Sequence, residues 1–183
     1  MNLVALLFFS MFSLTHGYLQ YVYNDRFLPQ SNNYGSFESA LIVQNKCKNK
    51  NKFTLSLEFK SPPKNDIFVN LSTSLTRVPS YTAIFGPFSK ISSLITVKST
   101  SPNSNVWLRK LDGISRIEEG SVLYLEFNVD RIKMMKTDTK LPMETIIFPI
   151  TANYVSPNYI SLGSWYGEIN FSKISLSCEV DIF

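Results

Sequence analysis

The amino-acid sequence predicts an all-β protein: one antiparallel β-sandwich, or partly closed barrel, of roughly 8 to 10 short strands with one disulfide. Three observations lead to this fold class. Apolar and polar residues alternate with a period of two in many short runs, and the nine prolines fall mostly at the ends of these runs. Almost no segment repeats its apolar residues with the helical period, so helices are not expected to contribute to the core.

The first 17 residues are predicted to be a secretory signal peptide. Residues 1–17 contain an apolar run, carry no Asp, Glu, Lys or Arg, and end on Thr15, His16 and Gly17. The apolar run is too short to span a bilayer, and the side chains at Thr15 and Gly17 suit signal peptidase. Cleavage would leave residues 18–183 as a single extracellular domain, which is long enough for one sizeable core.

Two segments show the clearest strand pattern. In 53–60 the apolar residues occupy every odd position, and in 121–129 they alternate with Tyr124, Glu126 and Asn128. Each therefore reads as a strand with one buried face. Weaker alternation, bounded by proline and other turn residues, predicts further strands at 39–43, 66–72, 81–85, 91–98, 106–110, 145–148 and 159–162.

The last predicted strand alternates from Ile174 to Ile182, with Cys178 on its apolar face. Ile169 and Phe171, just upstream, alternate on the opposite parity. If both halves face one core, a β-bulge is required near Ser172 and Lys173. Only residues 129–140 favour a helix, and then a short one, because Ile132, Met135 and Lys136 are spaced by three and four.

Histidine is absent from the predicted mature chain, because the only histidine is His16. This excludes Ser-His-Asp and Cys-His catalysis and histidine-ligated zinc. Chemistry by carboxylates alone stays open, but no motif for it was found, and Glu118 and Glu119 beside Gly120 read as a charged turn. We therefore expect a protein that is not an enzyme, with no catalytic residues, no cofactor and no metal ion.

The two cysteines, Cys47 and Cys178, are predicted to form a disulfide, since an even number of cysteines in a secreted chain favours pairing. Two unpaired thiols are the alternative. A bridge across a loop of about 130 residues would stabilise the fold by up to about 4 to 5 kcal/mol.

Two sequons, at Asn70 and Asn170, are candidate N-glycosylation sites. Each asparagine alternates with apolar neighbours, so in a strand both amides would face away from the core, as a glycan requires.

Four lysines in eight residues, Lys46, Lys48, Lys50 and Lys52, form the densest basic segment. They are a candidate site for a polyanion such as a sulfated glycan. The alternative is a solvated loop that protects the following strand from edge pairing. The net charge of +4 does not decide between a polyanion site and a solvated loop. We expect no nucleic-acid partner.

Aromatic residues reach 14% and crowd two regions of the chain. Exposed Tyr and Trp side chains are effective contact residues, although packing within strands is their common alternative role. The candidates for an aromatic contact surface are Tyr21, Tyr23, Tyr34, Trp165 and Tyr166.

These observations favour a secreted binding module that recognises an extracellular protein or glycan through loops and exposed aromatics. The alternative is a β-barrel carrier of a small apolar ligand, which would need inward apolar residues that frame a cavity. We expect no transmembrane segment and no lipid anchor. The sequence leaves the partner's identity and the oligomeric state open.

Overall fold

The computed structural model describes residues 18–28, 41–63, 66–75, 81–85, 94–97, 117–137, 144–150, 156–164 and 167–179. Within these ranges the regular elements are all β-strands, and no helix is long and apolar enough to cross a membrane. The strands are β1 (Tyr18–Leu28), β2 (Leu41–Gln44), β3 (Phe53–Phe59), β4 (Ile67–Ser72), β5 (Tyr81–Phe85), β6 (Leu94–Val97), β7 (Val122–Asn128), β8 (Arg131–Thr137), β9 (Glu144–Pro149), β10 (Tyr159–Ser164) and β11 (Ile169–Glu179).

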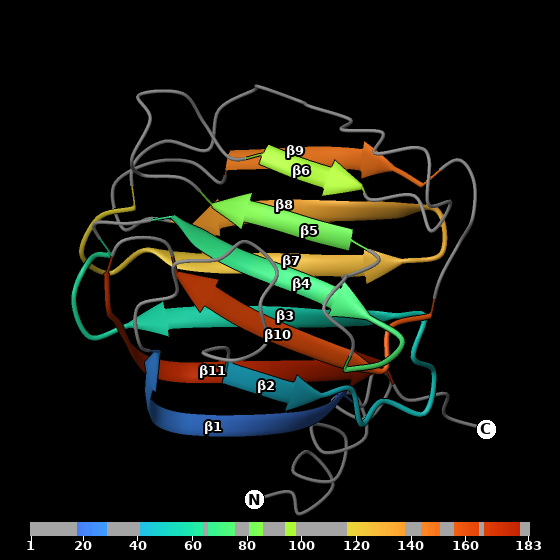
Figure 1. Ribbon diagram of the computed structural model, residues 1–183, viewed down its shortest axis with the longest axis horizontal. Coiled ribbons are helices and arrows are strands. Elements are labelled where there is room, and N and C mark those ends of the chain that lie inside the picture. The colour runs from blue at the N-terminus through green and yellow to red at the C-terminus, as the bar shows by residue number, and fades with distance from the viewer. Residues whose placement is uncertain are drawn as a thin grey trace, which may run out of the picture.

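The strands form two antiparallel sheets that pack face to face. One sheet has six strands in the order β1-β11-β3-β7-β8-β9, and the other has five in the order β2-β10-β4-β5-β6. Figure 1 shows the five-stranded sheet in front, with its strands crossing those behind at an angle. The edge strands β1 and β2 lie on one side of the molecule, and β6 and β9 on the other. The predicted all-β sandwich is confirmed, and the two separate sheets replace the barrel alternative.

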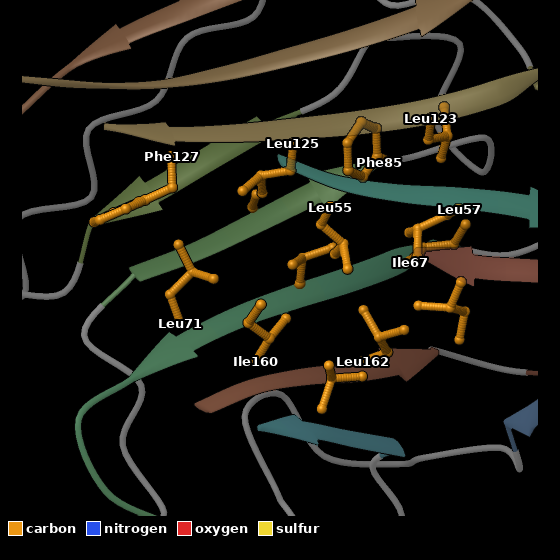
Figure 2. Packing of buried hydrophobic residues seen from close by; sticks show 14 of the residues in the cluster. Leu55, Leu57, Ile67, Leu71, Phe85, Leu123, Leu125, Phe127, Ile160 and Leu162 are labelled. Atoms are coloured by element: carbon orange, nitrogen blue, oxygen red, sulfur yellow. The ribbon is translucent and has the colours of Figure 1, made fainter. Parts of the chain in front are cut away.

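The core lies between the sheets and is built from the apolar face of each strand. In the six-stranded sheet, Leu55 of β3 lies opposite Leu125 of β7 and Leu176 of β11, so one face is continuously apolar. Figure 2 shows Leu55 and Leu125 facing residues of the other sheet such as Ile67 and Ile160. Each fully buried leucine contributes about 1.5 to 3 kcal/mol through the hydrophobic effect.

An aromatic contact also joins the two sheets. The rings of Tyr81, on β5, and Phe127, on β7, lie 5.8 Å apart, and Phe53 stacks on Phe127 at 5.3 Å. Large side chains from both sheets therefore interdigitate instead of framing a space. This packing argues against the carrier alternative, which requires a hollow interior.

The disulfide between Cys47 and Cys178 is confirmed, with a sequence separation of 131 residues. It joins the segment after β2, in one sheet, to β11 in the other. The buried Asn45 side chain shapes this segment, because its amide donates hydrogen bonds to the carbonyl oxygens of Pro157 (2.8 Å) and Lys50 (3.2 Å) and its oxygen accepts one from the Cys47 N–H (3.1 Å).

The predicted bulge in the last strand is confirmed, since the pairing of β11 with β3 shifts register between Phe171 and Lys173. The helix predicted within 129–140 is wrong, because Arg131–Thr137 is strand β8, paired with both β7 and β9. Its inward residues include Lys136, which is fully buried opposite Leu123. Because a lysine occupies one of the inward positions of β8, the alternation of apolar and polar residues in this strand was not recognised in the sequence.

Strand β1 was not predicted, although it is one of the two longest strands. β1 lies at the edge of its sheet, where strict alternation of apolar and polar residues is not required. Asp25, a turn-favouring residue, also interrupts the strand with a positive φ of 51°. The strand predicted at 106–110, the proposed signal peptide and the final residues 180–183 lie outside the described residues.

Candidate functional site

The outward face of the five-stranded sheet is buried along β4 and most of β10, whereas Ile42 on the edge strand β2 is exposed. All six residues of β4 are buried, including Phe68, Asn70 and Ser72, which point away from the core shared with the other sheet. Ser161 of β10, directly opposite Asn70, is also fully buried. This part of the sheet is therefore not open to a ligand.

Asn70 illustrates the consequence. Its side chain faces away from the core, as the alternation predicted, but only 2% of the residue is exposed. The Thr82 hydroxyl donates a hydrogen bond to Asn70 Oδ1 at 2.8 Å. The expectation that the Asn70 amide is accessible is wrong, because alternation specifies the side of a sheet but not whether that side is covered. Asn170, on β11, is exposed as expected, and its glycosylation stays a prediction.

The outward face of the six-stranded sheet carries small hydroxyl side chains near its middle. Thr54 of β3 pairs across the ladder with Ser177 of β11, and Ser56 pairs with Ser175. We call these four residues the hydroxyl row. On the other side of β3, the same face continues with Tyr124 opposite Ser56 and Glu126 opposite Thr54.

A hollow of about 240 Å³ lies at one end of the hydroxyl row. Its lining comes from β3, β7, β11 and the residue before β3. The lining residues are Lys52, Phe53, Thr54, Glu126, Ser177 and Glu179.

The charged side chains of the hollow are held by ion pairs. Lys52 pairs with Glu179, and both side chains remain partly exposed. Glu126 lies 3.7 Å from an Arg131 guanidinium nitrogen and 3.8 Å from Lys133 Nζ, both on β8. Because partly exposed pairs are weak, their polar atoms can exchange a partner for a ligand at small cost.

The hollow therefore combines two carboxylates, one ammonium group and two hydroxyls. Carboxylates only accept hydrogen bonds, ammonium groups only donate them, and hydroxyls do both. Such a set can satisfy a ligand that presents several neighbouring hydroxyl groups. Each carboxylate has a cation beside it, Lys52 for Glu179 and Arg131 and Lys133 for Glu126, so the charges around the hollow largely offset one another.

Of the four lysines predicted as a polyanion site, Lys46, Lys48 and Lys52 are exposed and Lys50 is partly buried. Lys46 Nζ lies 5.5 Å from the centre of the Tyr21 ring, and Lys50 Nζ donates a hydrogen bond to Asn158 Oδ1 at 2.8 Å. Lys52 belongs to the hollow, and Lys48 is exposed. The structure therefore gives these lysines separate neighbours, and polyanion binding stays an untested prediction.

Of the predicted aromatic contact residues, Tyr21 and Tyr23 are half-buried on β1 and pack against the core. The Tyr21 hydroxyl also reaches the carbonyl oxygen of Lys46 at 3.5 Å. Tyr34, Trp165 and Tyr166 lie outside the described residues.

The hydroxyl row and Glu126 were missed by sequence reasoning. The sequence did contain a signal for the hydroxyl row, because Ser or Thr occupies two alternate positions in each of two strands. Only the pairing of β3 with β11 shows that these residues lie next to one another.

The acidic pair Glu118 and Glu119 forms part of a turn, as predicted. The Ser121 N–H donates to the Glu118 carbonyl oxygen at 3.1 Å, and Gly120 has a φ of 81°, which favours glycine. In the part of the chain that the structure describes, no group of three or more His, Cys, Asp or Glu residues could hold a metal ion.

Comparison with known proteins finds solved structures with a similar fold. No protein-family model and no curated protein matches the sequence. Galectin-Ib of Xenopus laevis is similar in structure, with a TM-score of 0.53 and 15% identity over 75% of this chain and 98% of that one. The exoplasmic/lumenal domain of VIP36, in a form bound to Ca²⁺ and Man2, gives 0.52 and 11% over 92% of this chain and 82% of that one.

A third similar structure is the CBM2 module of the evolved Dit of Lactobacillus casei BL23 phage J-1. Its TM-score is 0.53, with 10% identity over 79% of this chain and 70% of that one. At these identities the likeness concerns the fold and not individual residues.

Proposed function

We propose that this protein is a secreted glycan-binding module and that the hollow on the six-stranded sheet binds a neutral sugar. The observation that carries the proposal is the hollow itself, where Lys52, Glu126 and Glu179 surround the hydroxyls of Thr54 and Ser177 on an open sheet face. No catalytic role is assigned to these carboxylates, and secretion is proposed from the signal peptide predicted at residues 1–17 alone.

Sugar chemistry fits this surface. A pyranose offers adjacent hydroxyls, each a donor and an acceptor, and an apolar C–H face. Glu126 and Glu179 can accept from such hydroxyls, Lys52 can donate to them, and hydrogen bonds to charged groups are the stronger kind. Tyr124 lies two residues from Glu126 on the same face of β7, beside the hollow and outside its lining. There its ring could contact the C–H face of a sugar that extends beyond the hollow.

The paired charges around the hollow suit a neutral glycan. Glu179 is paired with Lys52, and Glu126 with Arg131 and Lys133, so each of these cations has a carboxylate beside it. A neutral sugar can hydrogen-bond to these groups without adding a charge to the paired set.

The likeness to VIP36 supports the proposal at the level of the fold. That domain was solved with Ca²⁺ and Man2, and with Ca²⁺ and Man3GlcNAc, so a sandwich of similar architecture holds these sugars together with Ca²⁺. The identity of about one residue in ten transfers no binding residue to this chain.

The test is a screen of the secreted protein against immobilised neutral, sulfated and sialylated glycans, followed by titration of the best neutral ligand. Glu126→Gln should weaken its affinity by about tenfold or more, because a hydrogen bond to a charged group contributes about 1.5 to 3 kcal/mol.

Glu58→Gln is the matched control. Glu58 lies on β3 and on the same outward face, is similarly exposed, and is also paired with a lysine, Lys173, at 3.4 Å. It lies four residues from Thr54, about 13 Å along the strand, so its replacement should change the affinity by less than about twofold. Binding of no neutral glycan, or equal losses in the two variants, would contradict the proposal.

A further inference from the structure

We infer that Asn170 carries an N-linked glycan whose first sugar packs against Phe27, and that Asn70 carries none in the folded protein. This inference rests on the predicted secretion of the chain. It is independent of glycan binding in the hollow, because it concerns a sugar attached to the protein at another part of the sheet.

The position of Asn170 favours attachment. Asn170 is exposed near the start of β11, and its carbonyl oxygen accepts a hydrogen bond from the Lys60 N–H at 2.9 Å, which fixes the main chain. The sequon's third residue, Ser172, lies at the bulge and has no register partner on β3. Both residues of the sequon that take part in recognition are thus outside the tightly packed core.

Phe27 lies directly opposite Asn170 in the pairing of β1 with β11. Phe27 is 49% exposed, which is high for a phenylalanine in a strand. Side chains of opposed residues have Cβ atoms about 4.5 to 5.5 Å apart. A sugar bound to Asn170 Nδ2 therefore begins within reach of the Phe27 ring, which can cover the apolar face of that sugar.

A glycan here also accounts for an exposed apolar edge. β1 is an edge strand, and besides Phe27 it exposes Val22 at 44%. Long edge strands with exposed apolar side chains tend to pair with other chains unless they are covered. A bulky hydrophilic glycan next to Phe27 would supply such a cover.

Asn70 has none of these features. It lies in β4, between β10 and β5, with its oxygen held by the Thr82 hydroxyl at 2.8 Å. Its neighbours on the same face, Phe68, Ser72 and Ser161, are buried. A glycan at this position would have to displace packed side chains, so chains modified there would not reach this fold.

The modification is a transfer from a lipid pyrophosphate-linked oligosaccharide. A bond forms between Asn170 Nδ2 and the anomeric carbon of the first N-acetylglucosamine. The bond from that carbon to the pyrophosphate oxygen breaks, the lipid pyrophosphate leaves with the electron pair, and the amide loses one proton.

The first experiment measures occupancy in the full chain expressed in eukaryotic cells. Folded protein from the medium, or from the cells if it is retained, is treated with peptide N-glycosidase in H₂¹⁸O and mapped by mass spectrometry. We expect the isotope label at position 170 and an unmodified asparagine at position 70. An empty Asn170, or a glycan on Asn70 of the folded protein, would overturn the inference.

The second experiment tests the contact with Phe27. Enzymatic removal of the glycan should lower the Tm of the wild type by about 2 to 4 °C, and that of Phe27→Ser by less than about 1 °C. Val22→Ser is the matched control, because Val22 is a similarly exposed residue of β1 that lies opposite Ser175 and away from Asn170. It should keep the wild-type shift. Equal shifts in wild type and Phe27→Ser would refute the contact.

Discussion

The outward positions of β3 and β7 in one sheet, and of β4 and β10 in the other, carry similar patterns but differ in accessibility. On the six-stranded sheet, Thr54 and Glu126 border a hollow and keep part of their surface in solvent. On the five-stranded sheet, Asn70 and Ser161 occupy equivalent outward positions and are buried. Alternating polar residues therefore indicate which side of a sheet they occupy, whereas only the tertiary structure shows whether a ligand can reach them.

The largest expected effect compares a charge placed on each face. Ser161→Asp, on the covered face, should destabilise the fold by about 3 to 5 kcal/mol, since an unpaired charge would be buried. Ser56→Asp, on the open face, should change stability by less than about 1 kcal/mol. Urea unfolding measures both values. Equal losses would show that the two faces do not differ in burial.

Removal of the disulfide tests the link between the two sheets. The double variant Cys47→Ser with Cys178→Ser should lose about 2 to 4 kcal/mol of unfolding free energy. Because Cys178 lies between two hollow residues, Ser177 and Glu179, the variant should also bind the neutral glycan more weakly. Guanidinium unfolding and glycan titration give the two results. Unchanged stability would mean that sheet packing alone holds the segment after β2.

A smaller contrast concerns polar pairs on the two faces. Thr82→Val leaves the buried Asn70 oxygen without its hydroxyl donor and should cost about 1 to 2 kcal/mol. Lys173→Gln breaks the exposed ion pair with Glu58 and should cost no more than about 0.5 kcal/mol. Thermal unfolding of both variants tests this order, and the reverse order would contradict the burial assigned to Asn70.

The smallest effect is expected at the lysines outside the hollow. Replacement of Lys46 and Lys48 by Gln should change stability by less than about 1 kcal/mol, mostly through the lost contact of Lys46 with the Tyr21 ring. Affinity for a neutral glycan should stay within about twofold. A strong, salt-dependent loss of binding to a sulfated glycan in this variant would instead favour the polyanion site predicted from the lysine segment.

Sequence reasoning predicted most of the sheets because their pattern is local. The strand at 81–85 matches β5, and opposite parities of Phe171 and Ile174 were sufficient to predict the bulge. It failed where local pattern and tertiary role disagree: Lys136 faces inward, which made β8 resemble a helix, and the edge position of β1 relaxed its alternation.

The candidate site was harder to predict for a different reason. Thr54, Glu126 and Ser177 come from three strands that are distant in the sequence and adjacent only through the strand order β11-β3-β7. The spacing of residues within a single segment therefore cannot predict that these three side chains lie together. The disulfide could be predicted because its chemistry left a single pairing, whereas the hollow depends on the register of two ladders.

The disulfide also determines whether the two pieces of a proteolytically cleaved chain stay together. Cys47 and Cys178 enclose most of the domain, with a sequence separation of 131. Loops are the usual sites of proteolytic nicking. A single cut in any loop of that interval would leave two pieces that are still covalently joined, with the β11 side of the hollow tied to the segment that contributes Lys52. A nicked molecule would therefore keep its parts at the high local concentration that favours their reassociation.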